Sequence, residues 1–172
     1  MRLTRRSFGS VLLAAAAAPA FAQTATPGLP APKGRVILTV SGKIGVRNDG
    51  ETAKFDRDML EALGQSSFTT STPWYDAPTK FEGVPMARLL AAVQASGETA
   101  IASALNDYET RIPISDFQEF NVLLALKRDG EYMPVRDKGP LFIIYPFDSN
   151  PALKTQKYYS RSAWQLARLM IA

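Results

Sequence analysis

Two stretches of the chain repeat apolar residues at the spacing of an amphipathic helix. Over residues 55–63 the apolar side chains recur three or four positions apart, and residues 85–93 follow the same pattern. The second stretch begins with Pro85, which is tolerated in the first turn of a helix because its missing N–H has no partner there. We therefore predict two short amphipathic helices over these ranges.

The remaining apolar runs are short and rich in β-branched or aromatic residues, a pattern typical of strands. They cover residues 35–40, 66–71, 100–105, 108–114, 122–126, 141–145 and a closing segment, 162–171. Asp129-Gly130, between Leu126 and Met133, is the signal of a hairpin turn. Because helices and strands do not alternate regularly, the pattern predicts an α+β fold with a mixed sheet and a few short helices.

The first residues have the layout of a signal peptide. A basic segment, Met1–Arg6, precedes the apolar run Val11–Ala20, and Ala20-Phe21-Ala22 has the small-x-small pattern of a cleavage site. The run is shorter than the roughly 20 residues that span a bilayer. We predict a signal peptide over residues 1–22 and a periplasmic location; an uncleaved membrane anchor is the alternative. Residues 4–8 resemble a twin-arginine signal, although a general secretion signal fits as well.

The part of the chain after this leader has the composition of one domain with little net charge. Residues 23–34 are rich in proline, glycine and small residues and predict a flexible linker before a domain over residues 35–172. Three arginines of the leader contribute to the formal net charge of +4, so +1 remains on the rest. A balance so close to neutral argues against nucleic acid as a partner.

Two residue types are missing from the chain. It has no cysteine and no histidine. Cysteine thiolates, histidine ligands for zinc and Ser-His-Asp triads are therefore excluded. Any chemistry would have to use carboxylates, lysine, arginine, tyrosine or hydroxyl groups.

Four segments of the chain resemble one known family. They are Phe81-Glu82-Gly83-Val84-Pro85 with Leu89-Leu90, Ala104-Leu105-Asn106-Asp107-Tyr108 with Ile112-Pro113, residues 130–146, and Arg161-Ser162-Ala163-Trp164-Gln165-Leu166. In this order they are similar to segments of the sulfite-oxidase fold, the oxidoreductase molybdopterin-binding domain. The resemblance covers nearly all of the chain from about Arg35 and implies a pterin pocket.

The resemblance breaks down at the residue that binds molybdenum. Enzymes of this family carry a cysteine near the positions of Thr70 and Ser71, and a hydroxyl group is a poor substitute for a soft thiolate. The chain instead resembles a cysteine-less branch of small periplasmic proteins. That resemblance implies a non-catalytic module that binds a reduced pterin without molybdenum. It also implies a partner, the periplasmic domain of a membrane-bound signalling protein such as a cyclic-di-GMP enzyme or a histidine kinase.

Three other functions stay open from the sequence. The first is a molybdopterin-dependent oxidoreductase or its accessory subunit. The second is a metal-free pterin reductase. The third is a scaffold that kept the fold and binds only a protein partner.

The resemblance and the chemistry of a flat, hydrogen-bonding ring together select ten candidate pterin contacts. They are Ser71, Trp74, Asn106, Asp107, Tyr108, Arg136, Lys138, Tyr159, Arg161 and Ser162. Trp74 serves as an aromatic wall or as a core residue, and Asn106-Asp107 as polar contacts or as a turn. Arg136 and Lys138 belong to a charged loop that is either a pocket mouth or a solvated surface. Trp164 is assigned to the core.

Overall fold

The computed structural model describes residues 28–172. The signal peptide predicted over residues 1–22, and the predicted linker as far as residue 27, lie outside the described residues. Leu29 packs against the core, and the backbone N–H groups of Lys33 and Gly34 donate to Asp56 Oδ2 at 2.8 and 2.7 Å. Over the described range, no helix combines the length and the apolar character needed to cross a membrane.

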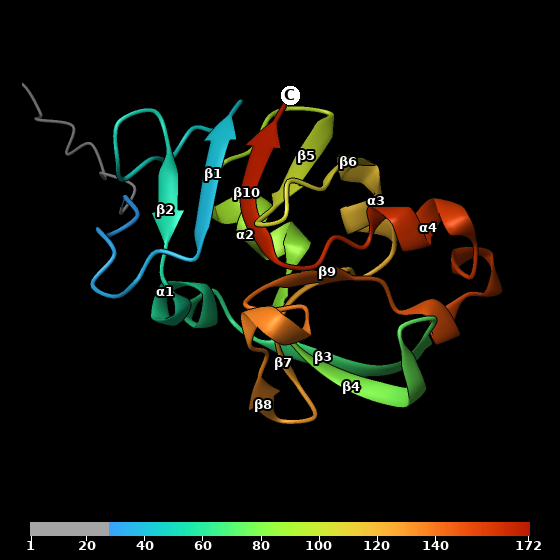
Figure 1. Ribbon diagram of the computed structural model, residues 1–172. Helices are drawn as coiled ribbons and strands as arrows, with labels where there is room; N and C mark the ends of the chain where they lie inside the picture. Colours follow the sequence, from blue (N-terminus) through green and yellow to red (C-terminus); the bar gives the residue numbers. More distant parts are fainter. Residues whose placement is uncertain (1–27) are drawn as a thin grey trace, which may run out of the picture.

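The first of two sheets joins the beginning of the described chain to its end. Its strands, in spatial order, are β2 (Ala53–Phe55), β1 (Leu38–Gly42), β10 (Leu166–Ile171), β5 (Thr99–Ala104) and β6 (Glu109–Pro113). β1 and β10 are parallel, and the other pairs are antiparallel. This sheet forms the upper part of the molecule in Figure 1.

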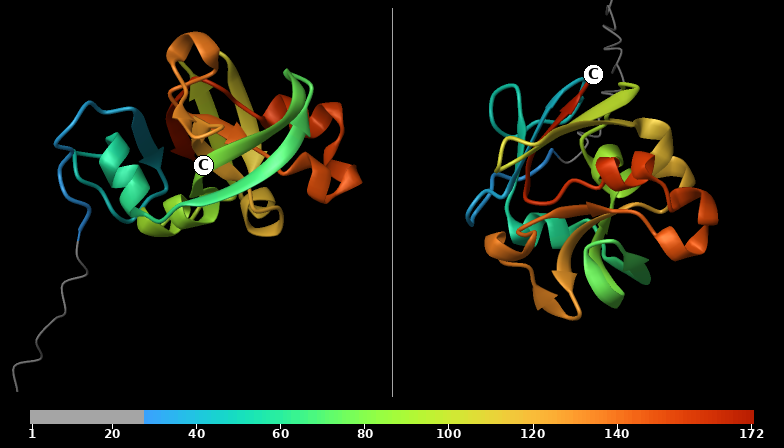
Figure 2. Two further views of the ribbon diagram at one scale, coloured as in Figure 1. Left: turned by 90° about the horizontal axis from the view of Figure 1, so that it is seen from below. Right: turned by 45° about the vertical axis from the view of Figure 1, so that its right-hand side comes forward.

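The second sheet is antiparallel and lies below the first in Figure 1. Its path runs through β3 (Ser66–Thr72), β4 (Tyr75–Pro85), β7 (Leu123–Arg128) and β8 (Glu131–Tyr132), and β9 (Phe142–Ile144) pairs with β7. The long β3–β4 hairpin curves toward the C-terminal helix, as Figure 2 shows. Its tip is therefore brought close to a segment that is far away in the sequence.

Short helices connect and cover the sheets. They are α1 (Arg57–Ala62), α2 (Met86–Ala92), α3 (Ile114–Glu119) and α4 (Gln156–Arg161), with 3-10 turns η1 (Val135–Asp137), η2 (Phe147–Ser149) and η3 (Pro151–Leu153). The Asp56 side chain caps α1 by accepting from the N–H of Met59 at 2.9 Å. α2 buries Met86, Leu89 and Leu90, as its apolar spacing predicts.

Two glycines of the family-like segments permit close backbone packing. A Cβ atom on Gly83 of β4 would lie 2.1 Å from the carbonyl oxygen of Leu124 in β7. A Cβ on Gly139 would lie 1.9 Å from the carbonyl oxygen of Met133. Any side chain at either position would collide with main chain, so these glycines are required by the fold.

The predicted α+β class, the strand signals and the hairpin turn at Asp129-Gly130 are confirmed, but several boundaries differ. Residues 35–37 precede β1, and Phe55 belongs to β2 rather than to α1. The closing segment forms a strand only from Leu166, after the unpredicted helix α4. The sequence did not predict β4, because Pro78 and polar residues interrupt its apolar pattern. The first part of β4 pairs only with β3, so it is an edge of the sheet, where a proline is tolerated.

Candidate functional site

A cavity of about 300 Å³ lies where the tip of the β3–β4 hairpin meets α4 and the start of β6. Aromatic side chains form most of its wall, and hydroxyl and amide groups complete it. The lining residues are Pro73, Trp74, Tyr108, Gln156, Tyr159, Ser160, Ser162 and Trp164. Segments separated by more than eighty residues in sequence therefore build a single site.

Trp74 stands at the centre of this aromatic wall. It occupies the two-residue turn Pro73-Trp74 between β3 and β4. Its backbone N–H donates to Thr72 Oγ1 at 3.3 Å. The Trp74 ring meets Trp164 at 5.5 Å and Tyr159 at 6.0 Å between centroids, both edge to face. Phe142 supports it from the core at 5.5 Å. Edge-to-face contacts of this kind hold the indole in one orientation.

The hairpin tip is fixed to η2 by a reciprocal pair of hydrogen bonds. The N–H of Ser71 donates to Asp148 Oδ2 at 2.6 Å, and the N–H of Asp148 donates to Thr70 Oγ1 at 3.0 Å. Lys154 adds an ion pair to Asp148 at 2.7 Å. The lysine and the Ser71 N–H together lower the pKa of the Asp148 carboxyl to about 2. Ser71 and Thr70 thus position the turn that carries Trp74.

Tyr108 closes the opposite side of the cavity. Its hydroxyl donates to the carbonyl oxygen of Ser160 in α4 at 2.7 Å. The preceding residues form the turn between β5 and β6, in which Asp107 has a φ of 64° and Asn106 Oδ1 accepts from the Tyr108 N–H at 3.3 Å. The Asn106 and Asp107 side chains are exposed beside the cavity and outside its lining.

The two faces of α4 have different roles. Gln156, Tyr159 and Ser160, three or four residues apart, face the cavity. On another face, Arg161 Nη1 donates to the buried Asp116 Oδ2 at 2.7 Å. Asp116 Oδ2 also accepts from the Tyr145 hydroxyl at 2.7 Å, and burial raises the pKa of that phenol. Arg161 is therefore committed to an internal network that holds α4 in place.

The charged loop lies behind the cavity. Lys138 has a φ of 63°, and its Nζ lies 5.0 Å from the Tyr75 ring centre and 5.7 Å from that of Trp164. It thus supports one wall from outside. Arg136 is exposed and forms no ion pair within residues 28–172.

The structure brings together four of the ten predicted contacts, namely Trp74, Tyr108, Tyr159 and Ser162. The other six lie outside the lining, and the role of all ten as ligand contacts stays a prediction. Sequence reasoning missed Gln156 and Ser160, and it assigned Trp164 to the core. Trp164 does pack on the core, but it also lines the cavity. The spacing of Gln156, Tyr159 and Ser160 was the available signal, and it required a helix that had not been predicted.

The arrangement suits a flat, partly polar ring. The volume of the cavity, about 300 Å³, lies at the lower end of the range of small-molecule sites, about 300–1,000 Å³. The aromatic groups offer faces and edges, and the lining also contains Gln156 and two serines. The Ser160 and Ser162 hydroxyls donate to carbonyl oxygens of α4, so toward a ligand they are acceptors. Within residues 28–172, no three side chains of His, Cys, Asp or Glu gather as a metal site.

Comparison with known proteins identifies the family. The family model described as "Oxidoreductase molybdopterin binding domain" matches residues 53–149, which is more than half of the chain. Trp74 and Tyr108 lie inside the match, whereas the cavity residues of α4 and Trp164 follow its end. No curated protein matches the chain. The chain belongs to the oxidoreductase molybdopterin-binding domain family, whose fold it shares and whose membership points to a pterin-type cofactor.

Proposed function

We propose that this protein is a periplasmic, non-catalytic module that binds a reduced pterin without molybdenum and regulates a membrane-bound sensor. The observation that carries the proposal is the cavity in which Trp74, Tyr108, Tyr159 and Trp164 meet. A pterin is a planar bicyclic ring with a hydrogen-bonding edge. Aromatic walls and a few polar groups are what such a ring requires.

The residues fit the pterin part of the family cofactor better than its metal part. A thiolate is the soft ligand that would bind molybdenum, and the chain has no cysteine. At the corresponding place, the Thr70 side chain is buried and its hydroxyl oxygen accepts the N–H of Asp148. We therefore derive no redox step at this site and assign binding as its role.

The regulatory role and the location rest on the sequence. The leader pattern over residues 1–22 supports export. The segments 71–74, 104–108 and 134–140 resemble the cysteine-less branch whose members dock on membrane-bound sensors. These are also the segments that form the cavity or lie beside it. A module of this kind would transmit pterin occupancy to a cyclic-di-GMP enzyme or a histidine kinase.

The decisive test is to identify the small molecule carried by protein exported in its native host. The protein is denatured by heat, and the supernatant is analysed by pterin fluorescence and mass spectrometry, with molybdenum measured in parallel. We expect equimolar pterin and no molybdenum, and loss of the pterin from the Trp74→Ala variant. Stoichiometric molybdenum would favour the oxidoreductase instead. Protein that stays empty even after incubation with reduced pterins would favour the scaffold.

The regulatory part needs its own measurement. The tagged protein is cross-linked in intact cells and recovered with its neighbours, once as wild type and once as Trp74→Ala. We expect a membrane sensor with a periplasmic domain whose recovery or output differs between the two. Equal recovery and equal output with both proteins would contradict regulation while leaving pterin binding intact.

A further inference from the structure

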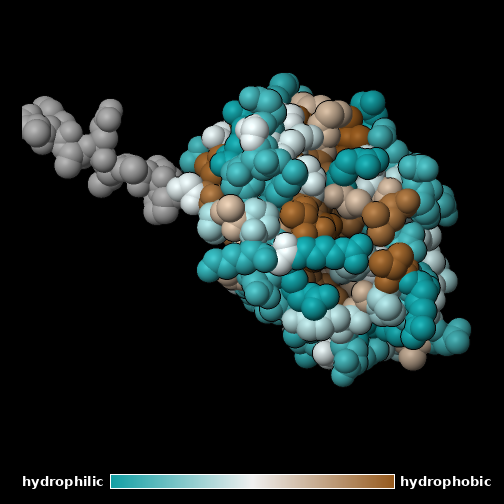
Figure 3. All heavy atoms as spheres, turned by 60° about the vertical axis from the view of Figure 1, so that its left-hand side comes forward, coloured by the Kyte–Doolittle hydropathy of each residue, from teal (hydrophilic) through white to brown (hydrophobic). Residues whose placement is uncertain are grey.

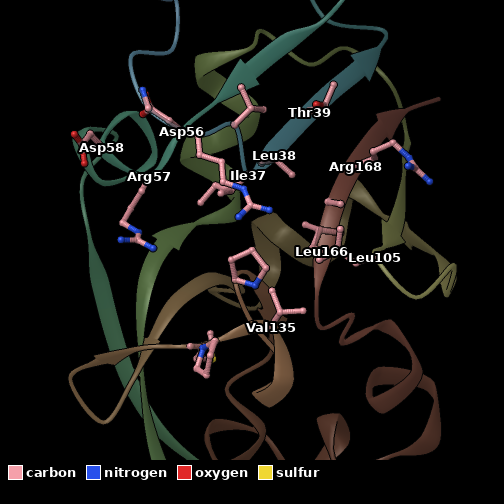
Figure 4. A pocket seen from close by; sticks show the side chains of 17 residues that line it. Ile37, Leu38, Thr39, Asp56, Arg57, Asp58, Leu105, Val135, Leu166 and Arg168 are labelled. Carbon is pink, nitrogen blue, oxygen red and sulfur yellow. The ribbon is translucent and has the colours of Figure 1, made fainter.

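A second and larger hollow lies away from the aromatic cavity. It has a volume of about 700 Å³ and shares no lining residue with the first. Figure 4 shows it between β1, the start of α1, β10 and the segment that contains Val135. Residues of the segments 104–108 and 134–140 line part of this groove, but the proposed pterin site does not include it.

Apolar side chains form the base of the groove and part of its rim. Leu38 and Leu166 are fully buried at its base. Around it stand Val36, Leu105 and Val135, which are 39%, 53% and 47% exposed. A space-filling view of this side shows apolar side chains gathered around a hollow and bordered by hydrophilic ones (Figure 3). Exposed apolar groups that converge on one concavity are typical of binding sites.

Unpaired positive charge surrounds the same groove. Arg35, Arg57 and Arg168 line it, and none of them forms an ion pair within residues 28–172. Arg57 and Arg168 lie on opposite sides in Figure 4. The Arg57 guanidinium lies 4.1 Å from the Tyr132 ring centre, a contact that restrains it.

Two acidic residues, Asp56 and Asp58, also line the groove; they form no ion pair with its three arginines within residues 28–172, and one positive charge remains in excess. Asp56 accepts the N–H groups of Lys33, Gly34 and Met59, and these bonds lower the pKa of its carboxyl. The Asp58 carboxylate points away from Leu38 and Leu166 in Figure 4. An anionic group entering the groove would therefore meet guanidinium groups.

The backbone around the groove argues for a small ligand rather than an added peptide strand. β1 pairs with β2 on one side and with β10 on the other. Within the described residues both edges of β1 are therefore occupied, so β1 offers no main-chain partners to an extended peptide. The volume of the groove lies within the range of sites for small organic molecules.

We propose that this groove binds a small amphipathic anion, with an apolar body against Val36, Leu105 and Val135 and a carboxylate or sulfonate at the arginines. This inference does not depend on the pterin proposal. Apolar burial would supply most of the affinity, and the guanidinium groups would select for negative charge.

The test uses the fluorescent anion 8-anilinonaphthalene-1-sulfonate with the folded protein, followed by displacement with octanoate and with neutral octan-1-ol. We expect saturable binding that octanoate displaces more effectively than octan-1-ol. Leu105→Asp should weaken binding by about tenfold, since it removes apolar contact and adds a like charge. Arg57→Gln should weaken it by roughly threefold, the effect of a partly exposed charge pair. Met170→Asp and Arg111→Gln, which change exposed residues outside the groove, are the matched controls.

Three results would overturn the assignment. The first is binding that Leu105→Asp and the controls leave equally unchanged. The second is binding that Trp74→Ala abolishes, which would place the probe in the aromatic cavity. The third is displacement by an acidic, leucine-rich peptide but not by octanoate, which would make the groove a protein-docking surface. Circular dichroism of each variant ensures that the probe reports on folded protein.

Discussion

Asp116 is a buried carboxylate whose partners come from distant parts of the sequence. Arg161 reaches it from α4 and Tyr145 from the segment after β9, each at 2.7 Å. The family resemblance suggested Arg161 as a ligand contact, and a guanidinium is a good partner for a polar ring edge. Its pairing with a residue 45 positions away could not be seen without the fold.

Replacing Arg161 should therefore affect stability first. Arg161→Gln leaves the Asp116 carboxylate buried without its cation, so we expect the free energy of unfolding to fall by about 3 kcal/mol. Urea denaturation measures this loss, with Arg136→Gln, at an exposed residue, as the matched control. Equal stability of the two variants would show that the Asp116 pair does not hold α4.

Asp148 gives the fold a specific dependence on acid. Its folded-state pKa of about 2 lies below that of an unfolded aspartate, about 3.9. The stabilisation is therefore complete above about pH 4 and is lost as the pH falls toward about 2. We expect wild type to be more stable than Asp148→Asn at pH 7, with a difference that shrinks at pH 2.5. A difference that is the same at both pH values would contradict the role of the carboxylate.

At the scale of elements, the sequence predicted the strands and helices whose apolar periodicity is undisturbed. The apolar stripe of α2 is an example. The turn at Asp129-Gly130 was predicted from its residue types instead. α4 escaped prediction because its six residues carry aromatic, hydroxyl and charged groups on different faces, without an apolar stripe. That helix supplies Gln156 and Ser160, so the error in the element became an error in the site.

Gln165 joins the two loops that flank the cavity. Its carbonyl oxygen accepts from Leu105 N–H at 2.9 Å, its N–H donates to Lys138 O at 3.0 Å, and its Nε2 donates to Val135 O at 2.7 Å. Its φ of 53° is a conformation that glycine adopts easily. Gln165→Gly thus removes the side-chain bond with little backbone strain.

We expect Gln165→Gly to lower the free energy of unfolding by about 1 kcal/mol, the usual contribution of one hydrogen bond. Amide hydrogen exchange over residues 135–139 should become faster, while exchange in β5 stays unchanged. Unaltered exchange in the loop would mean that its other contacts suffice to hold it.

At the scale of the whole molecule, the family resemblance predicted the fold class and the region of the site. The resemblance could do so because close packing between strands restricts the glycines and apolar residues of the four segments. An example is Gly83, which packs directly against the backbone of Leu124. The sequence of these segments could not show how far apart they lie in space. Only the fold shows that the hairpin tip, the β5–β6 turn and α4 enclose one cavity, and that a separate groove lies beside β1.

The central claim is that the aromatic cavity binds a pterin, and intrinsic fluorescence tests it directly. The chain has two tryptophans, Trp74 and Trp164, and both line the cavity. We predict saturable, equimolar quenching when a reduced pterin is titrated under anaerobic conditions. Trp74→Ala should raise the dissociation constant at least about tenfold, through lost ring contact, and Trp74→Phe should raise it less. The absence of saturable quenching, or equal affinity of wild type and a folded Trp74→Ala variant, would contradict the account.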